Sequence, residues 1–292
     1  PTGSGKSTTL YAMLSKAKSP ERHIVTIEDP VERRIKLVSQ IQINEKAGFS
    51  FATALRSILR QDPDVIMVGE IRDAETAQLS VRAALTGHLV FSTVHTNDAP
   101  GVVTRLVNMG IEPFLLSSSL AGVAAQRLAR RICEDCKQPH EIPAGLRQRL
   151  AASGITVPVS VWRGAGCPRC RNTGYSRRVA VFELMPVTPA LTDLIAANVP
   201  TSQIKIQARK DGMISMLEDG IAKAGQGVTT LQEVLRIAEL EMVMDSEAAP
   251  VKAAASAPSE ESPDKPPTGG PIGLDLDAYR KKMATWLAAK PK

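Results

Sequence analysis

The sequence predicts an α/β fold with a parallel sheet, and three features of its N-terminal part carry this prediction. A glycine-rich loop opens the chain and leads into an amphipathic helix. Short apolar runs rich in β-branched residues follow at 23–27, 65–68 and 88–94. Each run stops at acidic or polar side chains, as strands do at the ligand-facing edge of a parallel sheet.

The loop at 1–7 reads PTGSGKS and matches the end of the phosphate-binding motif G-x-x-x-x-G-K-[ST]. In such a loop, backbone N–H groups surround phosphate oxygens, the lysine contacts the β- and γ-phosphates, and the hydroxyl binds Mg²⁺. Lys6 and Ser7 are expected to take these two roles. A Gly/Ser turn that caps an ordinary helix is the alternative. The expected nucleotide contacts of this segment are Gly3, Ser4, Gly5, Lys6, Ser7 and Thr8.

A helix is expected over 7–17, because Leu10, Met13, Leu14 and Ala17 recur at helical spacing. Its N-terminus would face the phosphates. The first glycine of the motif and the strand that should precede the loop are not in this sequence. A truncated record, inactive as it stands, is therefore one interpretation of the chain.

Acidic side chains follow two of the expected strands. The run at 23–27 is followed by Glu28, Asp29 and Glu32. The run at 65–68 ends at Glu70, the pattern of a Walker B strand whose acid holds the shell of a Mg²⁺-bound water. Acids at the carboxyl ends of parallel strands can orient Mg²⁺ or water. The alternatives are an acidic surface loop for the first segment and a plain core strand for the second.

Two histidines bracket the next expected strand, His88 at its start and His95 at its end. His95 precedes Thr96 and Asn97 at a strand end, where a sensor of the γ-phosphate could sit. A structural histidine is the alternative at either position.

These motifs resemble those of the secretion ATPase superfamily, which contains the type II secretion ATPase and the type IV pilus assembly and retraction ATPases. The resemblance runs from residue 1 to about residue 237. It rests on the segments 3–7, 26–32, 59–64, 68–73 and 86–97, which look like the Walker A, Asp box, Walker B and His box motifs. Residues 110–120 look most like the type II secretion branch, with the pilus assembly branch a close second.

Four cysteines form two C-x-x-C pairs, Cys133 with Cys136 and Cys167 with Cys170. Two such pairs can place four thiolates around one Zn²⁺, and a site with four protein ligands leaves no open position for substrate. The metal is therefore expected to be structural, and four unrelated reduced cysteines are the alternative. The module resembles that of secretion and pilus assembly ATPases and argues against the retraction branch.

The resemblance implies a RecA-like P-loop core with a tetracysteine zinc-binding excursion and a helical C-terminal lobe. It implies a homohexameric ATPase at the cytoplasmic face of a bacterial inner membrane, which drives pseudopilus assembly and protein export with the machine's platform and recruitment proteins. Glu32 would polarise the attacking water, Glu70 would hold the metal shell and His95 would sense the γ-phosphate, while Glu28 could exchange roles with Glu32. Asp29 and His88 join the nucleotide-binding candidates. The implied cofactors are ATP, Mg²⁺ and Zn²⁺.

Arginines crowd the cysteine region, and a zinc ribbon with arginines can bind nucleic acid. They are Arg127, Arg130, Arg131, Arg169, Arg171, Arg177 and Arg178. The resemblance favours a subunit or partner interface instead. Only 3% of the residues are aromatic, so few rings are present to stack on bases. A DNA-translocating or zinc-dependent nucleic-acid-binding protein stays open as the alternative of a different class.

Five segments are expected along the chain. They are the ATPase core at 1–130, the zinc module at 131–180, a helical lobe at 181–244, a linker at 245–271 and a tail helix at 272–292. The linker is dominated by Ala, Ser, Pro, Glu and Lys and is expected to be disordered. The tail carries apolar residues on one helical face and would dock onto a partner or membrane surface. Packing against the chain's own body and a disordered end are the alternatives for the tail.

The composition fits a soluble globular chain, with 43% hydrophobic and 23% charged residues over 292 positions and a net charge of +6. Spanning a bilayer takes about 18 consecutive apolar residues, and no run approaches that length. Any link to a membrane is therefore expected to run through partners.

Overall fold

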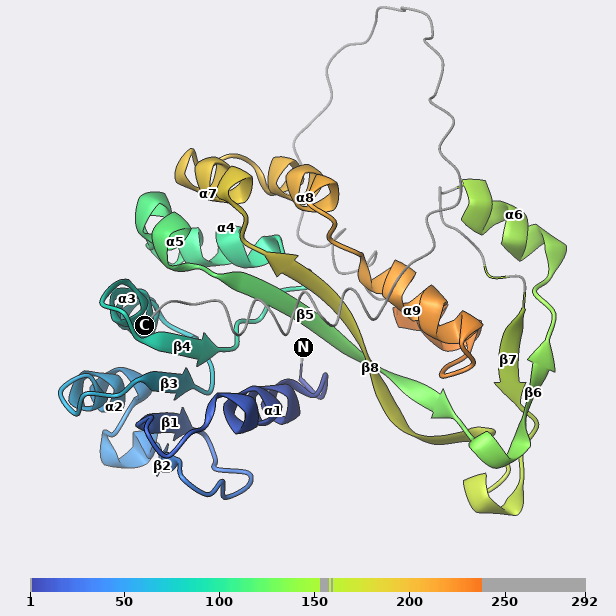
Figure 1. Ribbon diagram of the computed structural model, residues 1–292, viewed down its shortest axis with the longest axis horizontal. Helices are drawn as coiled ribbons and strands as arrows, with labels where there is room; N and C mark the ends of the chain where they lie inside the picture. The colour runs from blue at the N-terminus through green and yellow to red at the C-terminus, as the bar shows by residue number, and fades with distance from the viewer. Residues whose placement is uncertain (1, 153–157, 159, 238–292) are drawn as a thin grey trace, which may run out of the picture. The chain divides into compact units, whose positions relative to one another are not determined.

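The computed structural model describes residues 2–152, 158 and 160–237 (Figure 1). The linker expected at 245–271, the tail helix expected at 272–292 and the end of the helical lobe lie outside the described residues. Among the helices of the described part, none is long and apolar enough to cross a membrane.

A parallel sheet of four strands forms the N-terminal part, in the order β2-β1-β3-β4. Its strands are β1 (Ile24–Glu28), β2 (Ser39–Gln42), β3 (Val65–Val68) and β4 (Leu89–Ser92). The register places Ile27 opposite Val68 and Val68 opposite Ser92, so these strands end together at one edge. The expected α/β class with a parallel sheet is confirmed. The edge strand β2 was not predicted, because its sequence, SQIQ, is mostly polar and its side chains are exposed or partly exposed.

Alternate residues of the strands face two different cores. On one face, Ile24 and Met67 pack with Leu10 and Leu14 of α1 (Lys6–Ala17). On the other face, the core contains Val25, Ile27, Ile66 and Val68 and the inner sides of α2 and α3. Because helices cover both faces, the strand sequences are continuously apolar rather than alternating. The bounds on this side are η1 (Glu45–Ala47), α2 (Phe51–Ile58) and α3 (Ala74–Leu85).

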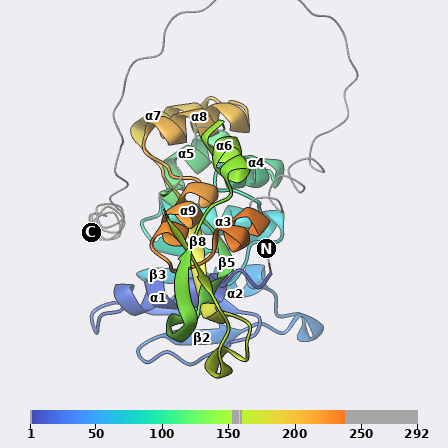
Figure 2. The same ribbon diagram turned by 90° about the vertical axis from the view of Figure 1, so that its right-hand side faces the viewer.

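Four further helices extend the second core. They are α4 (Gly101–Asn108), α5 (Pro113–Ser119), α7 (Pro189–Ala196) and α8 (Thr201–Lys210). Leu116 of α5, Leu191 of α7 and Ile204 of α8 are buried in the same core as the sheet. Figures 1 and 2 show α7 and α8 beside α5 and α4, which agrees with their packing contacts. The first helices after the cysteine region thus pack on the nucleotide core.

A long antiparallel ribbon connects the core to the cysteine region. Its strands are β5 (Gly122–Ile132) and β8 (Tyr175–Pro186), paired from Gly122 opposite Pro186 to Ile132 opposite Tyr175. An irregularity interrupts the pairing between Arg130 and Ile132. The boundaries proposed at residues 130 and 180 fall within β5 and β8, so the ribbon belongs to both neighbouring segments.

The region beyond the ribbon is built from short elements with their own small core. These are η2 (Glu134–Cys136), β6 (Lys137–His140), α6 (Ala144–Ala152), β7 (Val161–Gly164) and η3 (Pro168–Cys170). Helix α9 (Met216–Gly225) packs on β8 and β7, and Figure 1 shows it beside β8. Ile142, Val161, Ile221 of α9 and Val234 of the following helix share one apolar cluster. The last helical segments therefore support the cysteine region rather than the sheet.

Candidate active site and metal centre

The phosphate loop sits where glycine is required twice. Gly3 and Gly5 have φ angles of +75° and +89°, a region that residues with a Cβ atom rarely adopt. Helix α1 begins at Lys6 with no side-chain cap, so the N–H groups of its first turn are directed at whatever lies before the helix. Ser4 Oγ is buried and has no hydrogen-bond partner among the described residues. The N–H groups of a first helical turn and an unpaired buried hydroxyl fit a phosphate group at this loop.

Lys6 lies in a mixed electrostatic field. Partial burial lowers the pKa of its ammonium group, the carboxylate of Glu70 opposes this effect, and the cationic Arg127 adds to the lowering. The charges of Glu70 and Arg127 therefore both act on the Lys6 ammonium group. An anionic ligand would relieve the repulsion between Lys6 and Arg127.

The acidic segment after β1 contacts the loop through Glu32. The Ser7 hydroxyl donates a hydrogen bond of 3.1 Å to Glu32 Oε1, and Glu32 is exposed. Glu28 differs, because it is 4% exposed and already accepts hydrogen bonds from Tyr11, Thr26 and Gln40. Of the two carboxylates considered for the water, Glu32 is the one that faces the loop.

Glu70 follows β3 and lies between two basic groups. Its carboxylate pairs with Arg72, and its Oε2 lies 3.4 Å from His95 Nε2. Partial burial raises the pKa of Glu70, but the hydrogen bonds and charges of Arg72 and His95 outweigh burial and leave the pKa below its usual range. The side chain is therefore an oriented, ionised carboxylate at the carboxyl edge of the sheet.

The remaining candidates take different positions. Thr8 is exposed on α1, and Asp29 is exposed directly after β1, at the same edge of the sheet as Glu70. His88 lies at the opposite edge, before β4, with Nδ1 2.9 Å from the carbonyl oxygen of Ala83 and 3.1 Å from Thr86 Oγ1. The structure thus gathers the phosphate loop, Glu32, Glu70 and His95 but leaves His88 away from them.

The four cysteine sulfurs gather into one cluster, all within 4.8 Å of one another. The Sγ–Sγ distances are 3.8 Å for Cys133 and Cys167, 3.9 Å for Cys136 and Cys170, and 3.7 Å for Cys167 and Cys170. A tetrahedral site with Zn–S bonds of about 2.3 Å separates its sulfurs by about 3.8 Å. The geometry therefore fits Zn²⁺ bound by four thiolates.

The backbone around the cluster is shaped to donate to sulfur. The N–H groups of Cys167 and Gly174 donate hydrogen bonds of 3.2 Å and 3.3 Å to Cys170 Sγ. Burial raises the pKa of this thiol, but the backbone donors outweigh burial and lower the pKa to about 6. A Cβ on Gly164 would lie 2.0 Å from the carbonyl oxygen of Gly174, so only glycine fits there. This close approach of Gly164 and Gly174 closes the loop that contains the second cysteine pair.

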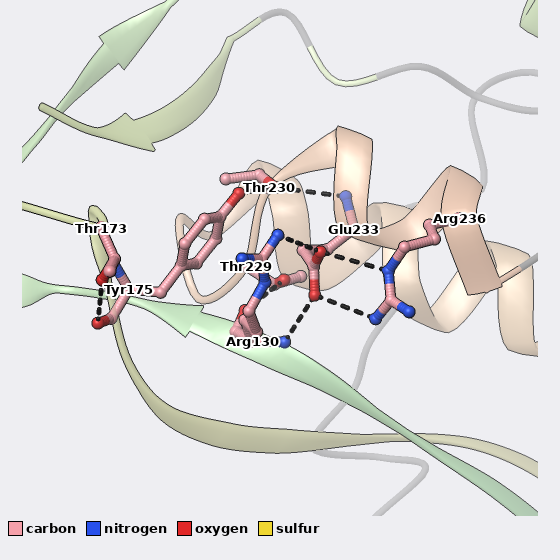
Figure 3. Close-up of polar contacts among 7 residues, drawn as sticks. All are labelled: Arg130, Thr173, Tyr175, Thr229, Thr230, Glu233 and Arg236. Carbon is pink, nitrogen blue, oxygen red and sulfur yellow. Dashed lines mark hydrogen bonds and ion pairs between the residues drawn. The ribbon is translucent and has the colours of Figure 1, made fainter.

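A buried carboxylate joins the ribbon to the helix that begins at Leu231. The Glu233 side chain is 1% exposed and pairs with Arg130 at 2.8 Å and Arg236 at 3.3 Å (Figure 3). Burial raises the Glu233 pKa, but the hydrogen bonds from both arginines outweigh burial and lower the pKa to about 2. Arg130 also lies over the ring of Tyr175, 4.1 Å from its centroid. This cluster fixes the last described helix to β5.

The model of a family described as "Type II/IV secretion system protein" matches residues 1–236. The chain belongs to this family. Among curated relatives, Type II secretion system ATPase E of Vibrio cholerae is 52% identical over 237 residues, which cover 81% of this chain and 47% of that protein. Type IV pilus assembly ATPase PilB of Thermus thermophilus is 50% identical over 236 residues, or 80% of this chain and 26% of that protein. The chain spans about half the length of the secretion relatives that it matches.

Solved structures agree with the family. The pilus retraction motor PilT with bound ADP has a TM-score of 0.60 at 33% identity, over 81% of this chain and 59% of that one. The ATPase DotB of Legionella pneumophila has a TM-score of 0.58 at 24% identity, over 82% of this chain and 58% of that one, which bears on the fold alone. The expected RecA-like P-loop core is confirmed.

Two residues of β5 were not predicted to lie near the loop, and Arg127 was instead grouped with the arginines of the cysteine region. Gln126 of β5 donates to the carbonyl oxygen of Ser4, and Arg127 contributes to the field at Lys6. No local signal marks Gln126, because the sequence of β5, GVAAQRLARRI, mixes small, polar and basic residues. The strand over 122–132 was itself not predicted.

Proposed function

We propose that the protein is the ATP-hydrolysing motor of a bacterial type II secretion system. The observation that carries the proposal is the meeting of the phosphate loop with Glu32, Glu70 and His95 at one edge of the sheet. The names of the relatives, which include a type II secretion ATPase at 52% identity, support the same activity.

Each residue has a role that its surroundings suit. The loop N–H groups and Lys6 bind the phosphates, and the Ser7 hydroxyl provides the Mg²⁺ ligand. Glu32, exposed beside Ser7, orients and polarises the attacking water, while Glu70 holds the metal's water shell. His95 and Arg72 fix the Glu70 carboxylate. In the proposed mechanism His95 also senses the γ-phosphate. ATP, when bound, supplies the phosphoryl group, so catalysis depends on positioning and charge neutralisation.

The cysteine cluster is proposed to hold one structural Zn²⁺. Its four thiolates complete a tetrahedral set, so the metal has no open position for chemistry. It would instead fix the far end of the β5–β8 ribbon, which passes beside the phosphate loop at Gln126.

The proposed assembly is a homohexamer at the cytoplasmic face of the inner membrane, bound to platform and recruitment proteins of the secretion machine. This proposal rests on the family resemblance and on relatives named as secretion and pilus ATPases. Its ATP hydrolysis would drive assembly of a pseudopilus and, with it, export of proteins.

Type IV pilus assembly is the second candidate function. The 50% identity to PilB of Thermus thermophilus favours it almost as strongly as the 52% identity to the secretion ATPase favours the first. The two are separated by deleting the gene in its host. A secretion motor predicts that exported enzymes stay in the cells while surface pili persist, and the reverse phenotype would move the protein to pilus assembly.

Nucleic-acid binding receives less support from the arginines. Arg130, Arg131 and Arg169 pair with Glu233, Glu134 and Asp135 at 2.8 Å, 2.8 Å and 2.7 Å. These guanidinium groups are engaged within the chain and are less available for phosphates of a duplex. Tight, steeply salt-dependent binding of duplex DNA would reverse this judgement.

A further inference from the structure

One buried side chain bridges both ends of the phosphate-binding turn. Gln126 Nε2 donates a hydrogen bond of 2.7 Å to the carbonyl oxygen of Ser4, and Gln126 Oε1 accepts one of 2.7 Å from Thr9 Oγ1. The residue is 8% exposed and lies on β5, far from the loop in the sequence. A single amide therefore spans the segment that contains Gly5, Lys6 and Ser7.

The bond to Ser4 fixes the direction of a peptide group. A trans peptide is planar, so the carbonyl of Ser4 and the N–H of Gly5 point in opposite directions. With the carbonyl oxygen directed at Gln126, the Gly5 N–H points away from Gln126. If the Ser4–Gly5 peptide were flipped, the carbonyl oxygen of Ser4 would take the place of the Gly5 N–H. This oxygen is a hydrogen-bond acceptor and would repel a phosphate.

The Ser4–Gly5 peptide needs a restraint on its orientation because the residue at position 5 is glycine. Gly5 adopts a φ of +89°, and glycine visits positive and negative φ with similar ease, so the Ser4–Gly5 peptide has little intrinsic preference. A Cβ on Gly5 would lie 2.8 Å from Gln126 Nε2, which shows how closely the two residues approach. Gln126 supplies the orientation that the glycine backbone does not.

We propose that Gln126 is a positioning residue that keeps the Gly5 N–H directed at the nucleotide phosphates, with Thr9 fixing the amide from its other side. The inference rests on the proposed nucleotide site, and it adds a residue from the ribbon to the machinery of the loop. The strand that carries Gln126 ends at Ile132, directly before Cys133, so the loop's geometry depends on the placement of β5.

The test is ADP binding by calorimetry in the full-length protein, with Gln126→Met as the main variant. Methionine keeps the length and packing of glutamine but can neither donate to Ser4 nor accept from Thr9. The expected result is about 10- to 100-fold weaker ADP binding, the equivalent of one lost hydrogen bond to a charged group. Gln203→Met, on the exposed surface of α8, is the matched control and is expected to bind ADP as the wild type does.

Two further variants separate the two hydrogen bonds. Gln126→Glu retains an acceptor for Thr9 but, when ionised, cannot donate to Ser4, so its ADP affinity is expected to fall as far as that of Gln126→Met. Thr9→Val removes only the hydrogen bond from Thr9 to the Gln126 side-chain amide, and it is expected to weaken ADP binding about two- to fivefold. In steady-state assays, the KM for ATP should rise in parallel with the ADP dissociation constant, while kcat stays within about threefold.

A merely structural role gives a different pattern. In that case Gln126→Met lowers the melting temperature of the nucleotide-free protein, but the folded protein binds ADP with wild-type affinity, and the proposal is overturned. If Gln126→Met does not fold, wild-type affinity in Gln126→Glu overturns it equally. A wild-type protein that binds ADP but does not hydrolyse ATP would refute the proposed function while leaving the binding test of Gln126 valid.

Discussion

The Ser7 hydroxyl donates a hydrogen bond of 3.1 Å to Glu32 Oε1, which joins the phosphate loop to the acidic segment after β1. The two residues are 25 positions apart and belong to different elements. A proposed metal ligand and a proposed water-polarising carboxylate thus lie within one hydrogen bond of each other.

Replacing Glu32 tests this pairing. Glu32→Gln keeps an oxygen that can accept from Ser7 but removes the charge that polarises water, so ADP binding should persist while kcat falls about 100- to 1000-fold. Phosphate-release assays beside ADP titrations measure both quantities, and Glu21→Gln on the surface before β1 serves as the control. Equal losses of binding and turnover would assign Glu32 to the nucleotide instead of the water.

Lys6 is expected to bind the phosphates of the nucleotide before any reaction takes place. Lys6→Ala removes the ammonium group proposed to meet the phosphates, so ADP affinity should drop below the detection limit of calorimetry. Lys16→Ala, an exposed lysine on the same helix, is the matched control. Retained ADP binding in Lys6→Ala would remove the phosphate loop from the site.

Stability at acid pH should depend on Glu233. Its pKa is about 2 in the folded chain, against about 4.3 for a glutamate in an unfolded chain. Because the folded pKa is the lower one, the contribution is present above about pH 5 and is lost as the pH falls towards 2, with a total on the order of 3 kcal/mol. Urea unfolding between pH 7 and pH 3 should show about half of this loss in the wild type, because the folded carboxylate is still mostly ionised at pH 3.

Glu233→Gln supplies the comparison for that experiment. The neutral amide leaves Arg130 and Arg236 without their carboxylate, so the variant should be less stable at pH 7 and should lose less stability on acidification. A variant whose stability falls with pH as steeply as the wild type's would show that other groups control the acid transition.

The cysteine cluster should contain one zinc ion per chain. Cys167→Ser removes one of four ligands and should release the metal, lower the melting temperature and leave ADP binding within a few fold, because the cluster lies at the far end of the ribbon. Metal analysis and thermal unfolding measure these effects. Well under one zinc per purified chain would refute the site.

The nucleotide core was predictable because its signals are local. The loop at 1–7, the apolar runs that became β1, β3 and β4, and the acids that follow them lie in short segments with strong patterns. The four cysteines were predictable for the same reason, since their doubled spacing indicates a shared metal.

The contacts made by β5 and β8 were not predictable, because they join residues far apart in the chain. The sequence of β5, GVAAQRLARRI, mixes small, polar and basic residues, and nothing local shows that Gln126 meets Ser4. The arginines of this region were weighed as a nucleic-acid surface, yet Arg130 is paired with a glutamate more than a hundred positions away. Glu28 was considered for the water because its place at a strand end fits that role, but its burial beneath Tyr11 is a tertiary effect.

The central claim, that this edge of the sheet hydrolyses ATP, is tested most directly by Glu70→Gln in the full-length protein. Glu70 is oriented by Arg72 and His95 and acts on the metal shell rather than on the bound phosphates, so the variant should bind ADP with near wild-type affinity. Its phosphate release should fall at least about 100-fold below that of the wild type. Near wild-type ATP hydrolysis in Glu70→Gln would contradict the account.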